Sequence, residues 1–181
     1  MGLVGVFGAF TGHAAQAQGF KLSGADITPG SSIKQAYAFN GFGCMGQNTS
    51  PAIAWKNPPA STKSFAVMMH DPDAPTGGAG FWLWVVVDIP ATAESLSRGV
   101  GTSEGSKLPT GARQIATDFG TPGWGGPCPP IGDKPHRYVF TVYALKVDRL
   151  ELPDNATASL AGFVVNANAL GHASFTALYG R

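Results

Sequence analysis

Short apolar stretches separated by turn-forming residues dominate the pattern along this chain. Stretches of this kind, bounded by Gly, Pro, Asn and Asp, are typical of β-strands. They predict strands at residues 20–27, 52–56, 64–71, 81–88, 112–118, 136–147 and 172–179. The stretches 81–88 and 136–147 are apolar at consecutive positions, which indicates strands that are covered on both faces.

One segment near the C-terminal end has helical periodicity instead. Within residues 155–170, the apolar side chains at helical spacing are Leu160, Phe163, Val164, Ala167 and Leu170. This spacing predicts a helix. Asp154 or Asn155 is in position to cap its first turn. Many short strands and one late helix predict a mostly β fold, a β-sandwich with one or two short helices, the main one near the C-terminus.

The alternation of side chains along a strand predicts which residues share a face. His136 and Tyr138 are two positions apart and should point the same way. His70 and Asp71 are adjacent and should point to opposite faces, so at most one of them enters a given pocket.

The same rule applies to the stretch 81–88. It places Leu83 on one face with Phe81 and Val85, and Trp82 with Trp84 on the other face. The simplest role for the two tryptophans is core packing, because large aromatic side chains bury much apolar area.

Composition excludes several classes of function. The chain has 181 residues, of which 44% are hydrophobic, enough for one domain with a sizeable core. Its net charge is +1 and no run of Lys and Arg is present, so we expect no nucleic-acid partner. No apolar stretch reaches the ~20 residues of a transmembrane helix. Because HExxH, CxxC and P-loop motifs are absent from the sequence, we expect neither a metal site nor a cofactor.

The first residues have the features of a signal peptide. Residues 3–10 are apolar, and Ala15-Gln16-Ala17 fits the small-residue pattern of a cleavage site. The sequence therefore predicts a signal peptide at 1–17 and one domain at 18–181, in a periplasmic or secreted protein. No Lys or Arg precedes the apolar run, which leaves a misplaced start and a cytoplasmic protein as the alternative.

Three motifs stand in a distinctive order and spacing. They are Asn-Thr-Ser-Pro at 48–51, Asp-Pro-Asp-Ala-Pro at 71–75, and Gly-Pro-Cys-Pro-Pro at 126–130 leading into His-Arg-Tyr-Val-Phe at 136–140. Together they resemble the phosphatidylethanolamine-binding protein family, in its bacterial Raf-kinase-inhibitor-like branch. The resemblance implies a β-sandwich with a small surface cavity that accepts phosphate-like anions and phospholipid head groups.

The resemblance also assigns roles to single residues. It implies that Asp71, His136 and Tyr138 contact the ligand and that Gly126 and Pro127 form one wall of the pocket. The loop that fixes the aspartate would contain Pro72, Asp73 and Pro75.

The sequence departs from the family at one pocket position. The usual bacterial pattern is two aromatic residues, His and Trp, whereas this chain has Phe81-Trp82-Leu83-Trp84. We expect Leu83 and Trp84 to border the ligand, with Leu83 unable to donate a hydrogen bond or carry charge.

Two of the pocket residues have simpler alternative roles. An Asp before Pro commonly starts a turn, so Asp71 either caps the turn that follows or orients His136, and both roles are compatible. His136 itself is either a pocket donor, with a full charge when protonated, or a strand residue bonded to the backbone.

Cys44 and Cys128 are the two cysteines of the chain. An exported protein would join them in a disulfide, closing a loop of about 84 residues, whereas a cytoplasmic protein would keep two buried thiols.

These observations favour a non-enzymatic binding protein. Its ligand would be a small anion or a phospholipid head group, and the resemblance adds a kinase or a protease as a protein partner. Two alternatives stay open. One is a small-molecule enzyme that uses Asp71, His136 and Tyr138 as an acid/base cluster. The other is an interaction protein whose pocket became vestigial when Leu83 replaced a histidine.

Overall fold

The computed structural model describes residues 19–181, so the predicted leader at 1–17 lies outside the described residues. The strands are β1 (Lys21–Gly24), β2 (Asn40–Gly41), β3 (Cys44–Met45), β4 (Ile53–Lys56), β5 (Ser64–Asp71), β6 (Phe81–Pro90), β7 (Ser95–Leu96), β8 (Arg113–Gln114), β9 (His136–Leu145) and β10 (Ala169–Tyr179). The described part also contains the 3-10 turn η1 (Gln35–Tyr37) and the helix α1 (Ala158–Asn168). The expected mostly β fold with one main helix near the C-terminus is confirmed.

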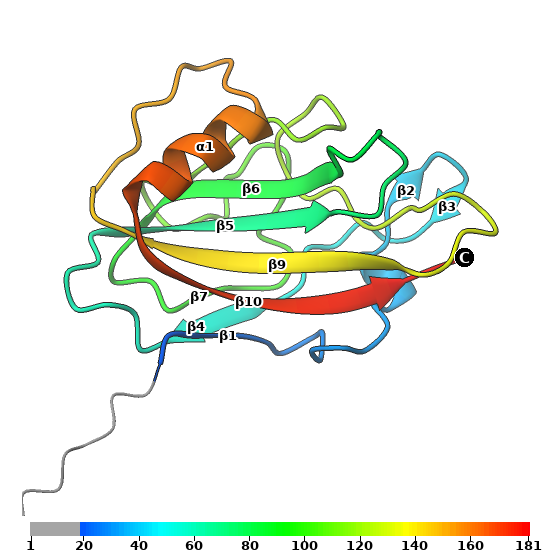
Figure 1. Cartoon of the computed structure of the whole chain (residues 1–181), viewed down its shortest axis with the longest axis horizontal. Coiled ribbons are helices and arrows are strands. Elements are labelled where there is room, and N and C mark those ends of the chain that lie inside the picture. The colour runs from blue at the N-terminus through cyan, green and yellow to red at the C-terminus, as the bar shows by residue number, and fades with distance from the viewer. Residues whose placement is uncertain (1–18) are drawn as a thin grey trace, which may run out of the picture.

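The elements form three layers, with α1 over one face of the larger sheet and the smaller sheet on its other side (Figure 1). The larger sheet has the order β10-β9-β5-β6-β8, and the smaller sheet has the order β1-β4-β7. The hairpin of β2 and β3 lies at the same end of the molecule as the end of β10. None of the helices within residues 19–181 has the length and apolar character needed to cross a membrane.

Two hydrophobic cores flank the larger sheet. The core between the two sheets contains Trp55, Trp84, Trp124, Tyr138 and Phe140, and the core under the helix contains Met68, Val85, Leu145, Ala161 and Val165. Strands β5, β6 and β9 run through the middle of this sheet and contribute side chains to both cores. This position explains why the stretches 81–88 and 136–147 are apolar at consecutive positions.

The alternation of β6 is broken at Leu83. Two adjacent residues of β5 pair with Trp84 and Trp82, so the intervening Leu83 is the extra residue of a β-bulge. Trp84 therefore faces the core between the sheets, on the side of Leu83, while Val85 and Trp82 face the helix. The predicted groupings of Trp84 with Trp82 and of Val85 with Leu83 were wrong, because strict alternation assumes a strand without a bulge.

Helix α1 starts later than residue 155 and turns a different face to the sheet. Its N-cap is Thr157, whose Oγ1 accepts a hydrogen bond from the backbone N–H of Leu160 at 3.2 Å. Neither Asp154 nor Asn155 therefore caps it. The helix ends at Asn168, so Leu170 belongs to β10.

The buried face of α1 consists of small residues. They are Ala158, Ala161, Gly162 and Val165. A Cβ placed on Gly162 would lie 3.5 Å from Cε of Met68, so the helix lies close to the sheet and leaves no room for large side chains. Phe163 is consequently 74% exposed, and Leu160 is 40% exposed. The apolar side chains whose spacing indicated the helix are therefore not its buried face.

Two strand predictions also differ in length. The stretch 112–118 contains only the short strand β8, and the strand expected at 172–179 begins earlier, at Ala169. Outside β8, residues 112–118 form loops with an isolated β-bridge at Ala116.

Candidate functional site

A cavity of about 390 Å³ opens where β5 ends and β9 begins; we call it the first cavity. Its polar lining residues are Asp71, Thr76, His136, Tyr138 and Arg181. Its other walls include Phe42, Phe81, Leu83, Phe119, Cys128, Pro129 and Pro130. Leu83 lines the same cavity as His136 and Tyr138. This is the location expected for it from the resemblance, in which its position is a pocket position.

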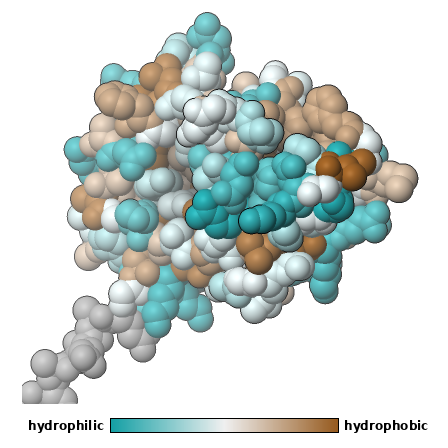
Figure 2. Space-filling model, turned by 45° about the vertical axis from the view of Figure 1, so that its right-hand side comes forward, coloured by the Kyte–Doolittle hydropathy of each residue, from teal (hydrophilic) through white to brown (hydrophobic). Residues whose placement is uncertain are grey.

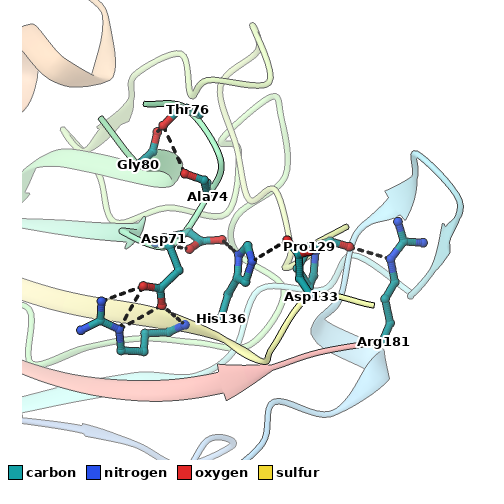
Figure 3. A network of polar contacts seen from close by, with 10 residues as sticks. Asp71, Ala74, Thr76, Gly80, Pro129, Asp133, His136 and Arg181 are labelled. Atoms are coloured by element: carbon teal, nitrogen blue, oxygen red, sulfur yellow. Dashed lines mark hydrogen bonds and ion pairs between the residues drawn. The ribbon is translucent and has the colours of Figure 1, made fainter. Parts of the chain in front are cut away.

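Asp71 and His136 form a buried pair at this point because β5 and β9 are antiparallel neighbours. Nδ1 of His136 lies 2.8 Å from Oδ2 of Asp71, and each residue is 5% exposed. On the other side of the ring, Nε2 lies 3.4 Å from Oδ2 of Asp133 (Figure 3). The histidine therefore stands between two carboxylates.

The surroundings of His136 favour its protonated form. Burial of the ring lowers the pKa of His136, but the hydrogen bonds and negative charges of Asp71 and Asp133 outweigh it. The pKa of His136 consequently lies above its usual value. Because Asp71 holds Nδ1, Nε2 is the nitrogen that remains for a ligand.

Asp71 also starts the turn that follows β5. Its Oδ1 accepts a hydrogen bond from the backbone N–H of Asp73 at 2.9 Å, while its Oδ2 faces His136. The structure thus contains both the turn role and the orienting role expected for this residue.

The turn is tied to β9 through a second ion pair. Asp73 accepts hydrogen bonds from the backbone N–H of Arg137 at 2.8 Å and from its guanidinium Nη2 at 2.7 Å. The guanidinium of Arg137 beside it lowers the pKa of Asp73 to about 2. The turn between Pro72 and Pro75 is thereby fixed against the strand that carries His136.

Tyr138 brings a buried hydroxyl to the same cavity. The side chain is fully buried, and its Oη interacts with the carboxylate of Asp71 at a looser geometry than that of a normal hydrogen bond. Burial raises the pKa of Tyr138, and the negative charge of Asp71 raises it further. The phenol therefore stays neutral and keeps an O–H that can donate.

Three residues expected at the pocket lie outside the lining of this cavity. Trp84 is in the core, where its Nε1 donates to Oε1 of Gln114 at 2.9 Å. A Cβ on Gly126 would lie 2.1 Å from the backbone oxygen of Tyr37, so this glycine packs against η1. The backbone oxygen of Pro127 accepts a hydrogen bond from the backbone N–H of Phe39 at 3.1 Å. The wall is instead made by the next residues along the chain, 128–130.

Sequence reasoning did not identify Phe42, Phe119 or Arg181 as lining residues. Arg181 donates from Nε to the backbone oxygen of Pro129 at 2.7 Å and from Nη2 to that of Phe42 at 3.3 Å. It therefore connects the two loops that border the cavity. Neither a lone arginine nor a phenylalanine in a loop carries a sequence pattern that would indicate this position.

The predicted disulfide is present between Cys44 and Cys128, with their Cα atoms 6.0 Å apart. Cys44 lies in β3, and Cys128 lies in the loop that forms one wall of the first cavity. The bond holds the hairpin that carries Phe42 against that wall.

Comparisons with known proteins agree with this architecture. Residues 23–180 match the family model described as phosphatidylethanolamine-binding protein. The chain is 47% identical to UPF0098 protein YbcL of Escherichia coli over 171 residues, which cover 94% of this chain and 93% of that protein. It is 43% identical to UPF0098 protein YbhB of the same organism, over 88% of this chain and 99% of YbhB.

The fold is similar to that of a solved relative. The crystal structure of Escherichia coli YbcL, described as a member of the mammalian PEBP family, superimposes with a TM-score of 0.87. The match covers 90% of this chain and 98% of YbcL. The sequence motifs, the two-sheet architecture and these matches agree, and the chain belongs to the phosphatidylethanolamine-binding protein family.

Proposed function

We propose that this protein binds a small anion or the phosphorylated head group of a lipid in the first cavity, without catalysing a reaction. The observation that carries the proposal is the pair of donors on one face of β9. His136 Nε2 and the Tyr138 hydroxyl line the same cavity, and the hydroxyl interacts with the carboxylate of Asp71 only at a looser geometry than that of a normal hydrogen bond. Because a buried hydroxyl is stabilised by a well-formed hydrogen bond, a ligand oxygen would stabilise this one.

The charges around His136 are compatible with an anion. When the imidazole is protonated, its pair with Asp71 is neutral overall, and the remaining N–H is a charge-assisted donor. Asp133 lies at the longer distance of 3.4 Å, and its side chain is 44% exposed. An anion can therefore replace Asp133 at Nε2 by a small movement of an exposed side chain.

Export and a protein partner belong to the same proposal. A cleaved leader would place the cavity in the periplasm or outside the cell, where the disulfide of Cys44 and Cys128 is stable. A kinase or protease partner would contact the rim of the first cavity.

Titration calorimetry with inorganic phosphate and phosphoethanolamine tests the proposal. We expect His136→Ala to weaken binding by at least about tenfold and Tyr138→Phe by about three- to tenfold, as expected for a charged and a neutral hydrogen bond. Tyr143→Phe is the matched control, because Tyr143 lies on the same strand but packs against the core under the helix. Equal affinity in His136→Ala and wild type would place the ligand elsewhere.

Leu83→His should strengthen anion binding in a pH-dependent manner. Leu83 is 2% exposed and lines the cavity, so an imidazole there adds a donor that faces the ligand. A hydrogen bond to a charged group is worth about 1.5–3 kcal/mol, which corresponds to about tenfold or more in affinity. The gain should be largest below pH ~6.5 and should shrink as the new histidine loses its proton.

Leu83→Asn is the control for this prediction, because it adds a donor that does not titrate. Its effect on phosphate affinity should not follow pH. If folded Leu83→His binds phosphate no better than wild type at the lower pH, Leu83 does not face the bound anion.

A further inference from the structure

The first cavity has an apolar side that the anion proposal does not use. Nine of its fourteen lining residues are apolar or belong to the disulfide, and three of these nine are Phe42, Phe81 and Phe119. The cavity volume of about 390 Å³ falls within the ~300–1,000 Å³ of sites for whole small molecules. A phosphate ion is small beside this volume. An anion held by His136 and Tyr138 would therefore contact only one side of the cavity.

The three phenylalanine rings present both faces and edges to a ligand. The rings of Phe81 and Phe119 meet edge to face, with centroids 4.9 Å apart and planes at 76°. Phe42 lies nearly parallel to Phe119, at 15° and 6.1 Å. Phe42 is 77% exposed, and Phe81 and Phe119 are half-buried, so all three keep surface that a ligand can reach. A further aromatic ring packs favourably in such a setting, by offset stacking or edge to face.

The rings and the anion donors belong to one continuous lining. The pairing of β5 with β6 sets Phe81 beside Asp71, and Asp71 holds Nδ1 of His136. At the surface of this end of the molecule, hydrophobic side chains likewise lie directly beside hydrophilic ones (Figure 2). A single small molecule can therefore contact the donors with one end and the rings with the other.

The carboxylates at this site are poorly placed for the amine of a lipid head group. Among the described residues, Asp71 is the carboxylate that lines the cavity, and both of its oxygens are engaged, Oδ1 by the backbone N–H of Asp73 and Oδ2 by His136. Asp133, which the anion would displace from Nε2, is not a lining residue. Phenylalanine faces attract cations less strongly than tryptophan faces do. The apolar side of the cavity therefore suits an uncharged ring better than an ammonium group.

We propose that the first cavity selects a small anion that carries an aromatic ring, such as an aryl phosphate monoester, over inorganic phosphate and phosphorylated head groups. The anionic group pairs with Nε2 of His136 and the hydroxyl of Tyr138, and the ring packs among Phe42, Phe81 and Phe119. This inference rests on the anion site proposed above and adds to it the apolar half of the ligand.

Titration calorimetry with phenyl phosphate and methyl phosphate tests the selectivity, because the two esters carry the same charged group and differ in the apolar one. We expect phenyl phosphate to bind about tenfold more tightly, since its ring removes additional apolar surface from water. Phosphocholine carries a cationic group in place of the ring. It should bind more weakly than phenyl phosphate.

Substitutions in the ring wall should reduce this selectivity. Phe42→Ala and Phe119→Ala should each lower the ratio of phenyl phosphate affinity to methyl phosphate affinity by about threefold or more. Phe163→Ala is the matched control, because Phe163 is 74% exposed but lies on α1, outside the cavity, and its removal should leave the ratio unchanged. Should Phe119→Ala fail to fold, Phe42→Ala decides, since its exposed ring contributes little to the core.

His136→Ala separates this inference from the anion proposal. If both esters bind equally well and both weaken in His136→Ala, the anion site stands and the selectivity for a ring is overturned. Tighter binding of phosphocholine than of phenyl phosphate overturns it too, as does an affinity ratio in Phe42→Ala equal to that of the wild type. If neither ester loses affinity in His136→Ala, the anion lies elsewhere and both proposals fail.

Discussion

Asp71→Ala is expected to lower the free energy of unfolding by about 3–5 kcal/mol, the usual cost of removing one partner of a buried ion pair. The carboxylate accepts from the backbone of Asp73 and faces Nδ1 of His136 at 2.8 Å, and both members of the pair are buried. Its removal leaves a buried imidazole without its partner and an open turn. Chemical denaturation of the variant and the wild type measures the difference.

The same pair gives the stability a pH dependence with a defined sign. The pKa of His136 is raised in the folded chain relative to the unfolded value of ~6.5. The stability that protonated His136 contributes to the fold is therefore fully present below pH ~6.5, and it is lost as pH rises through the pKa of His136 in the folded chain. The difference in the free energy of unfolding between wild type and Asp71→Ala should narrow as pH rises through this range.

Asp133→Ala is the matched control, because it removes the other carboxylate from the same ring. The Asp133 side chain is 44% exposed, and its Oδ2 lies 3.4 Å from Nε2 of His136. We therefore expect this variant to lower the free energy of unfolding by about 1 kcal/mol or less. A loss in Asp71→Ala as small as in Asp133→Ala would show that the buried pair does not stabilise the fold.

Removal of the disulfide is expected to have the second large effect. Cys44 and Cys128 are 84 residues apart, and for a loop of that length the chain-entropy model gives about 4–5 kcal/mol, with less commonly found in practice. The double variant Cys44→Ala/Cys128→Ala should therefore unfold at a clearly lower denaturant concentration than the oxidised wild type. It should also bind phosphate more weakly, because the bond holds Phe42 against the wall at 128–130.

Comparison with single variants separates the bond from the side chains. Cys44→Ala and Cys128→Ala should each lose about as much stability as the double variant, since either change removes the whole bond. A double variant as stable as the oxidised wild type would contradict the expected contribution. So would two free thiols in protein purified from an oxidising compartment.

Local sequence patterns predicted the strands better than the helix surface. The consecutive apolar residues of β6 and β9 indicated coverage on both faces, and the structure has a core on each side of that sheet. The helical periodicity located α1 but not its buried face. A stripe of large apolar residues predicts burial only where the sheet leaves room, and close approach at Gly162 leaves none.

For the site, the motifs located the residues that come from strand ends. Asp71 closes β5 and His136 opens β9, so an antiparallel pairing is enough to bring them together. The contributions of Phe42, Phe119 and Arg181 depend on loops that the disulfide and backbone contacts hold in place. Such long-range contacts leave no local pattern. The bulge at Leu83 is a further example, because it moves Trp84 into the core and away from the cavity.

The central claim is that the first cavity holds an anion between His136 and Tyr138. A crystal structure of the protein soaked with phosphate, or with phosphoethanolamine, tests it most directly. The account predicts an ordered anion with one oxygen within about 3 Å of both Nε2 of His136 and Oη of Tyr138, and Asp133 turned away from the ring. A structure in which Asp133 stays on Nε2 and the ordered anion lies outside the first cavity would contradict it.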